Sequence, residues 1–371
     1  MIRTCFSLAF LLCATGLGVA QQPDQYDLAK LNQSMAGRID DFTHNHGRDN
    51  RITSTILSQK RDLYVYVPPD YNPAFTYPLV LWLHGAFVDE HSFLTSGNVE
   101  ALDRMIASGR CPPMIVACPD GTYTGQNRLL SRHSLYLNGE GGAVEDHIMQ
   151  EVLPFLFSRY SITPGRDYHG IAGISAGGAG AMSLALRHRD LFSAAASTSG
   201  VLNLRYDTAS GDYFAPFSPD TFRWKTTYQP WQVGAKFGLM RVHARFLVEP
   251  IFGRDPGVIE RVKRVNPADL LELTDLRPGE LRMYVRYGDK DEINCDGQGA
   301  SFVWLAGQRG VPVDVESVQG AKHAAPFFRE SSEQMYLWLG RQFEASAQAA
   351  AGPVGVTPAV LPTVARPKDG Q

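Results

Sequence analysis

Residues 168–178 read YHGIAGISAGG, and this stretch decides the fold prediction. A short apolar strand runs into the pattern Gly173-Ile174-Ser175-Ala176-Gly177, and a helix-forming run follows over 179–186. A serine on so tight a turn has a strained backbone, so the residues two before and two after it must have almost no side chain. The stretch therefore predicts a nucleophile elbow with Ser175 as the nucleophile.

A serine hydroxyl is a weak nucleophile, and it needs a histidine base that a carboxylate orients. The last predicted strand, over 311–318, leads to His323, and the last predicted helix follows. A histidine in a loop after a late strand can reach the serine at the carboxyl edge of a parallel sheet. His323 is therefore the predicted base.

The orienting carboxylate is expected after the strand predicted over 281–287, in the turn Gly288-Asp289-Lys290-Asp291-Glu292. A carboxylate three residues past the strand-ending glycine reaches across the turn better than one at the strand edge. Asp291 is therefore preferred as the acid, and Asp289 is the alternative. The order serine, acid, histidine along the chain is that of the α/β-hydrolase fold.

An oxyanion hole for this serine needs two backbone N–H groups. The amide of Ala176, directly after the nucleophile, is one predicted donor. Residues 77–83 form a continuous apolar strand of the kind that is buried on both faces, and His84-Gly85-Ala86-Phe87 follows. The amide of Ala86 in this loop is the second predicted donor.

Taken together, these features resemble the putative-esterase group of α/β-hydrolases. This group includes feruloyl and acetyl xylan esterases, esterase D, enterochelin esterases and the mycobacterial mycolyltransferases. Besides the elbow, the resemblance rests on residues 61–71, which read RDLYVYVPPDY, on 77–85, and on 144–154 with Tyr160, and it spans about 55 to 340.

The resemblance implies an α/β-hydrolase fold, with a mostly parallel central sheet, helices on both faces, and the triad Ser175, Asp291 and His323. Two positions depart from the family pattern. Ala176 stands where the family often has methionine, and Ala325 stands where it often has tryptophan. The identity of the substrate therefore does not transfer from any one member.

The chain is predicted to divide into a signal peptide over 1–20, an irregular N-terminal arm over 21–50, a catalytic domain over 51–345 and a disordered tail over 346–371. The signal peptide is predicted from Arg3 and the apolar run that ends in small residues before Gln21. It indicates a secreted or periplasmic protein. The tail is predicted from its alanine, valine and proline content.

An insertion over 201–265 interrupts the alternation of strands and helices after the sixth predicted strand. It contains 11 aromatic residues among 65, which is 17% against 11% for the whole chain. Because it lies between two strands that border the site, it is interpreted as a cap or pocket wall. The alternative is that most of its rings pack a small core of the insertion's own.

Several other functions are disfavoured. Without residues 1–20 the chain has 34 basic and 38 acidic residues, a net charge of −4, which disfavours nucleic acid as a partner. No later segment is apolar enough for an integral membrane helix. No metal or organic cofactor is predicted, since His44 and His46 lack further ligands and Ile293 breaks a calcium-loop pattern.

The sequence thus predicts an exported serine carboxylesterase that acts through an acyl-enzyme on a small-molecule or polysaccharide-linked ester, such as a feruloyl or acetyl ester. The alternatives are an acyltransferase of the mycolyltransferase type, a siderophore esterase of the enterochelin type, and a non-catalytic carbohydrate-binding protein. The oligomeric state stays open.

Overall fold

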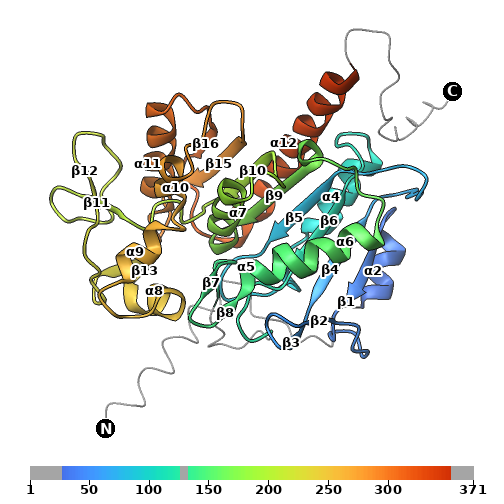
Figure 1. The fold of residues 1–371 in the computed structure, drawn as a ribbon, viewed down its shortest axis with the longest axis horizontal. Coiled ribbons are helices and arrows are strands. Elements are labelled where there is room, and N and C mark those ends of the chain that lie inside the picture. The colour runs from blue at the N-terminus through green and yellow to red at the C-terminus, as the bar shows by residue number, and fades with distance from the viewer. Residues whose placement is uncertain (1–26, 126–132, 352–371) are drawn as a thin grey trace.

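The computed structural model describes residues 27–125 and 133–351. Its centre is an eight-stranded sheet in the order β1-β4-β6-β5-β9-β10-β15-β16 (Figure 1). The strands are β1 Arg38–Phe42, β4 Leu63–Val67, β6 Ile115–Pro119, β5 Leu79–Leu83, β9 His169–Ile174, β10 Ala194–Thr198, β15 Arg282–Gly288 and β16 Asp314–Val318. Strand β4 is antiparallel to both of its neighbours, and the other neighbouring pairs are parallel.

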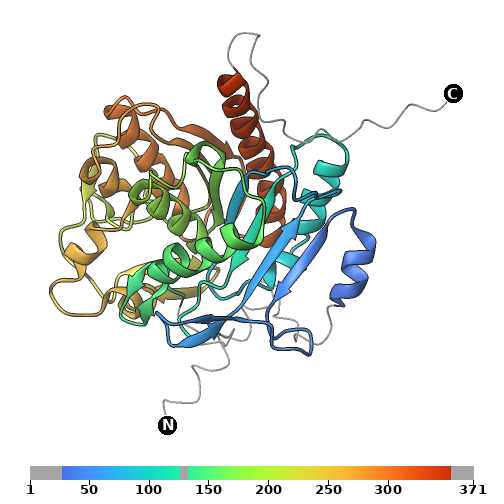
Figure 2. The ribbon, with the colours of Figure 1, turned by 45° about the vertical axis from the view of Figure 1, so that its right-hand side comes forward.

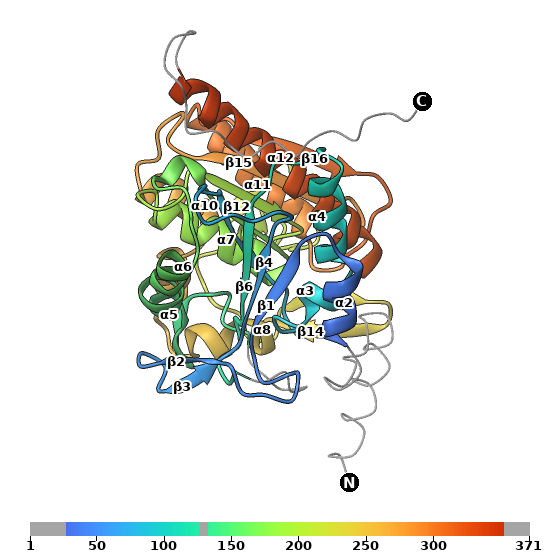
Figure 3. The same ribbon diagram turned by 90° about the vertical axis from the view of Figure 1, so that its right-hand side faces the viewer.

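Helices cover both faces of this sheet (Figures 1 and 3). One face is covered by α5 Val144–His147, the π-helical turn Ile148–Val152, α6 Leu153–Arg159, α7 Ala176–Arg187, α10 Pro267–Leu273 and α11 Cys295–Gln308. The other face is covered by α2 Leu28–Ser34, α3 Ser92–Thr95, α4 Asn98–Ala107 and α12 Ala325–Ala351. Residues 144–159 thus form one continuous helix with a π-helical turn in it.

The strand side chains alternate between two buried clusters, one under each helical layer. In β5, Leu79, Leu81 and Leu83 pack toward α7, whereas Val80 and Trp82 pack toward α4 and α12. All five residues are buried, which is the burial pattern of a central parallel strand. The two clusters fix the sheet between its helices, so the loops at the carboxyl ends of the strands have fixed starting points.

The insertion over 201–265 lies at the opposite end of the molecule from α2 and β1 (Figure 1). It contains two small hairpins and two helices: β11 Tyr206–Thr208, β12 Phe222–Trp224, β13 Val233–Phe237, β14 Met240–His243, α8 Ala244–Phe252 and α9 Val258–Lys263. It follows β10, the sixth strand of the main sheet along the chain. The remaining elements are β2 Ile52–Ser54, β3 Gln59–Arg61, β7 Asn138–Gly139, β8 Gly142–Ala143 and the 3₁₀ turn Arg166–Tyr168.

The prediction of an irregular arm over 21–50 is wrong for its described part, because α2 and β1 lie there and β1 extends the main sheet (Figure 2). The buried carboxylate of Asp103 on α4 accepts hydrogen bonds from the amides of Ala36 and Gly37, at 2.9 and 2.7 Å. His44 bonds Asp62 through Nδ1 at 2.9 Å. These contacts tie the segment to the sheet.

The boundary of the predicted tail is also wrong, because α12 continues through residues 346–351. Residues 352–371 and the predicted signal peptide over 1–20 lie outside the described residues. Within 27–125 and 133–351, no helix is both long and apolar enough to cross a membrane.

Candidate active site

Ser175 lies on the turn between β9 and α7 with φ 53° and ψ −120°, a conformation that is costly for any residue with a side chain. The turn is possible because two glycines allow a very close approach of the backbone. A Cβ on residue 173 would lie 2.4 Å from the carbonyl carbon of Gly177, and a Cβ on residue 177 would lie 2.0 Å from the oxygen of Leu83. The elbow predicted from the sequence is present.

The structure brings Ser175, His323 and Asp291 together. Nε2 of His323 lies 2.9 Å from Oγ of Ser175, and Nδ1 lies 2.8 Å from Oδ2 of Asp291. All three residues are buried. Because the ionised carboxylate can only accept, Nδ1–H of His323 donates to it and Nε2 is left to accept from the serine hydroxyl. The ring of Phe328 packs edge-on against His323, at 4.9 Å between centroids.

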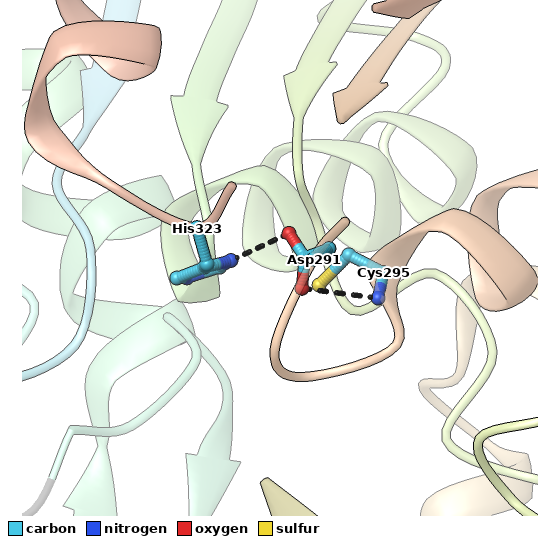
Figure 4. A group of neighbouring side chains, drawn as sticks. All are labelled: Asp291, Cys295 and His323. Atoms are coloured by element: carbon cyan, nitrogen blue, oxygen red, sulfur yellow. Dashed lines mark hydrogen bonds and ion pairs between the residues drawn. The ribbon is translucent and has the colours of Figure 1, made fainter. Parts of the chain in front are cut away.

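The carboxylate of Asp291 is held on its far side by main-chain amides. Its Oδ1 accepts from the amide of Ile293 at 2.9 Å. It also accepts from the amide of Cys295 at 3.3 Å (Figure 4). Burial raises the pKa of Asp291, but the charge and hydrogen bond of His323 and the two amides lower it more, so the pKa lies below its usual value. Asp291 is therefore ionised at neutral pH.

Asp289, the alternative acid, has a different partner. Its Oδ1 accepts from the amide of Gly320 at 2.6 Å, which ties together the loops after β15 and β16. Glu292 accepts from the amide of His323 at 2.9 Å. Of the three carboxylates in this turn, Asp291 is thus the one in contact with the imidazole, and its neighbours fix the loops on which the two residues lie.

The side chains of Asp291, Cys295 and His323 also bring potential metal ligands within 4.8 Å of one another. Both ring nitrogens of His323 are already used in hydrogen bonds. Burial raises the pKa of the Cys295 thiol well above its usual value, so the thiol stays protonated. These three side chains therefore do not fit a metal centre, and Asp291 and His323 are already bonded within the triad with Ser175.

The loop after β5 passes directly over the serine. A Cβ on Gly85 would lie 3.5 Å from that of Ser175, and Ala86 follows. Ala176 begins α7 immediately after the serine. The two amides predicted to form an oxyanion hole therefore belong to the two segments that meet at Ser175.

Sequence analysis missed the side chain that shapes this loop. His84 is fully buried, and its Nε2 accepts from the amide of Gly121 at 2.9 Å. That bond leaves the ring proton on Nδ1, which donates to the carbonyl of Gly85 at 2.9 Å. The hydroxyl of Tyr136 donates to the carbonyl of His84 at 3.3 Å. The only available signal was the position of His84 at the end of a buried strand.

The chain matches a protein family described as "Putative esterase" over residues 54–327. An esterase of Mycobacterium tuberculosis (strain ATCC 25618 / H37Rv) is 28% identical over 158 residues, which are 42% of this chain and 33% of the relative. The chain thus spans about a third of the length of this curated relative.

Solved structures with similar folds include a ferulic acid esterase, with a TM-score of 0.57 and 20% identity over 83% of this chain and 100% of the other. They also include an S-formylglutathione hydrolase from Agrobacterium tumefaciens, with a TM-score of 0.60 and 16% identity over 84% of this chain and 97% of the other. The prediction of an α/β-hydrolase fold is confirmed. The chain belongs to this esterase family.

Proposed function

We propose that the protein is an exported serine carboxylesterase that hydrolyses its substrate through an acyl-enzyme intermediate. The observation that carries the proposal is the continuous hydrogen-bonded chain from Ser175 through His323 to the ionised Asp291. This arrangement lets a hydroxyl lose its proton to a base at the moment of attack. The family match supports the ester as the bond that is cleaved.

The reaction takes place in two halves. Oγ of Ser175 attacks the ester carbonyl carbon while its proton moves to Nε2 of His323. The amides of Ala86 and Ala176 stabilise the oxyanion, and the C–O bond to the alcohol breaks as His323 returns the proton to the alcohol oxygen. Water then attacks the acyl-enzyme by the same route, which releases the acid and restores Ser175.

The cellular part of the proposal rests on the sequence. The apolar run over 5–20 after Arg3 is typical of an export signal, so the substrate is an ester met outside the cytoplasm. We favour feruloyl or acetyl esters of polysaccharides. This substrate class is supported by one structural neighbour named as a ferulic acid esterase and by exposed rings on the insertion.

The exposed rings belong to Trp231 and Phe246, whose exposed fractions are 66% and 55%. The guanidinium of Arg245 lies over both, at 4.6 and 5.1 Å from their centroids. Exposed aromatic rings beside a cation are suited to stacking against a sugar or a cinnamoyl ring. The other rings of the insertion, such as those of Tyr206 and Phe222, pack against one another.

The test is the hydrolysis of p-nitrophenyl acetate by the wild type and by Ser175→Ala. We expect the variant to lose activity and labelling by a fluorophosphonate probe without loss of the fold. Ser183→Ala is the matched control: it removes a buried hydroxyl on α7 that has no hydrogen-bond partner among the described residues, so activity should be retained. Wild-type turnover by Ser175→Ala would contradict the proposal.

The same preparation distinguishes the alternatives. A binding protein without catalysis would not react with the fluorophosphonate. An acyltransferase would form new esters when glycerol or trehalose is added, whereas a hydrolase would release the free acid. A panel of acetyl, butyryl, feruloyl and siderophore esters then ranks the acyl groups.

A further inference from the structure

The triad acid lies on an irregular loop, over residues 289–294, between β15 and α11. Asp291 itself has no regular secondary structure to hold it. Its Oδ1 accepts hydrogen bonds from the amides of Ile293 and Cys295, and these bonds hold the carboxylate in place. Asn294 has φ 61°, in the left-handed region that asparagine adopts more readily than most residues other than glycine. The loop also has hydrogen-bond partners outside itself.

Those partners come from the insertion, and they bind three consecutive residues of the loop. The amide of Lys236 on β13 donates to the carbonyl of Glu292 at 2.8 Å. The hydroxyl of Tyr213 donates to the carbonyl of Ile293 at 2.9 Å. The side-chain amide of Asn294 donates to the main-chain carbonyl of Tyr213. Tyr213 therefore contacts the loop both through its side chain and through its backbone.

The hydroxyl of Tyr213 is itself held from the other side. Its oxygen accepts from Nε2 of Gln298 at 2.8 Å. Gln298 lies in the first turn of α11 and is fully buried, and its Oε1 accepts from the amide of Asn203 at 3.3 Å. Burial raises the pKa of Tyr213 well above its usual value, so the hydroxyl keeps the proton that it donates to Ile293.

We infer that Tyr213 is a positioning residue for the reaction, which sets the place of the Asp291 carboxylate by fixing Ile293. The inference rests on the proposed function, since it assigns Tyr213 to the same triad. The peptide between Asp291 and its amide donors is short, so a shift of Ile293 moves the carboxylate. Displacement of a catalytic group by about 1 Å can lower a rate about 100-fold.

In this arrangement the insertion supports the acid loop from the side and does not only cover the site as a cap would. Lys236 and Tyr213 contact the acid loop from two separate segments of the insertion, on β13 and on the loop between β11 and β12. The insertion therefore supports the loop that carries Asp291, whatever ester it admits.

The test compares Tyr213→Phe with Tyr206→Phe. Tyr206 is the matched control, because its hydroxyl donates to a main-chain carbonyl of the same insertion, that of Ala215 at 2.9 Å, and does not contact the acid loop. We expect Tyr213→Phe to lower kcat on p-nitrophenyl acetate about 10- to 100-fold with KM within about twofold of the wild type. Tyr206→Phe should leave both constants close to wild type, and thermal unfolding should show both variants folded.

A second measurement does not depend on turnover. The proton on Nδ1 of His323, shared with Asp291, should give a downfield signal in the proton NMR spectrum of the wild type and of Tyr206→Phe. Tyr213→Phe should weaken or broaden it. An unchanged signal together with a kcat equal to that of Tyr206→Phe would overturn the inference. If Ser175→Ala kept its activity while the signal still changed in Tyr213→Phe, the proposed function would fail and the positioning role would stand.

Discussion

Gly177 lies against the last residue of β5: a Cβ at this position would be 2.0 Å from the carbonyl oxygen of Leu83. The first turn of α7 and the end of β5 are therefore in contact backbone to backbone. This contact places the loop that carries Gly85 and Ala86 over Ser175. The nucleophile and the predicted oxyanion amides thus lie close together because residue 177 is a glycine.

We therefore predict that Gly177→Ala is strongly destabilising. The added methyl meets main-chain atoms, which cannot rotate away, so the strand end or the helix must shift, at a cost of about 1–3 kcal/mol or more. Thermal unfolding should show the loss, together with reduced esterase activity. Gly307→Ala on α11 is the control, because nothing lies within 4 Å of its Cβ position. Equal stability of the two variants would show that the elbow tolerates a side chain.

The assignment of the acid makes a second prediction. Asp291→Asn should lower kcat by about 10⁴-fold, because the amide favours the wrong tautomer of His323 and carries no charge to stabilise the imidazolium. Asp289→Asn should lower kcat much less, since Asp289 bonds Gly320 and not the imidazole. The measurement is steady-state hydrolysis of p-nitrophenyl acetate at pH 7. The reverse ranking would move the acid to Asp289.

A third prediction concerns the pH dependence of stability. Burial, and then the charges of Asp89, Asp120 and Asp62, raise the pKa of Glu90 well above its usual value. Below the pKa that Glu90 has in the unfolded chain, this carboxyl does not lower the stability of the fold. As the pH rises above that value, Glu90 releases its proton in the unfolded state but keeps it in the folded state, so the free energy of unfolding falls. Glu90→Gln keeps the acceptor for Asn45 and removes this cost.

We expect Glu90→Gln to match the wild type in Tm near pH 4 and to exceed it at pH 8 by roughly 2 °C, which corresponds to about 1 kcal/mol in a domain of this size. The measurement is a series of thermal melts from pH 4 to pH 8. A difference between the two proteins that does not change with pH would exclude Glu90 as the source.

A fourth prediction addresses the exposed rings. Trp231→Ala should raise the KM for a feruloylated oligosaccharide about two- to tenfold, as expected for the loss of ~0.5–1.5 kcal/mol of aromatic contact. It should leave p-nitrophenyl acetate hydrolysis unchanged. Trp224→Ala should instead lower Tm, because Trp224 packs edge-on against Phe222 and beneath Arg205. If the ester panel is ranked as in the wild type, Trp231 does not set specificity.

The elbow could be predicted from the sequence because its constraints are local. Gly173 and Gly177 fall at fixed distances from Ser175, and a buried strand precedes them. The positions of Asp291 and His323 were predictable to within one turn, since each follows a recognisable strand. The sequence favoured Asp291 over Asp289 as the acid only because Asp291 lies further past the end of the strand. Which of the two contacts the imidazole depends on how the loops after β15 and β16 fold against each other.

Contacts between distant segments could not be predicted. Strand β1 reads RIDDF with Ile39 as its one buried residue, so it has no clear apolar alternation, and Asp103, which anchors the preceding turn, is 66 residues from Gly37. Tyr213 meets Ile293 across 80 residues, and nothing in its local sequence separates it from the other ten aromatic residues of the insertion.

The buried cysteines have a practical consequence. Cys111, Cys118 and Cys295 are unpaired and nearly inaccessible in the folded protein. Cys295 lies beside the triad acid, whereas Cys118 lies within β6 in the middle of the sheet. Reaction with a thiol reagent, followed by peptide mapping, would therefore measure the rates at which these two cysteines become exposed in the same sample. Modification of Cys295 reports the opening of the acid loop, and modification of Cys118 reports the opening of the whole sheet.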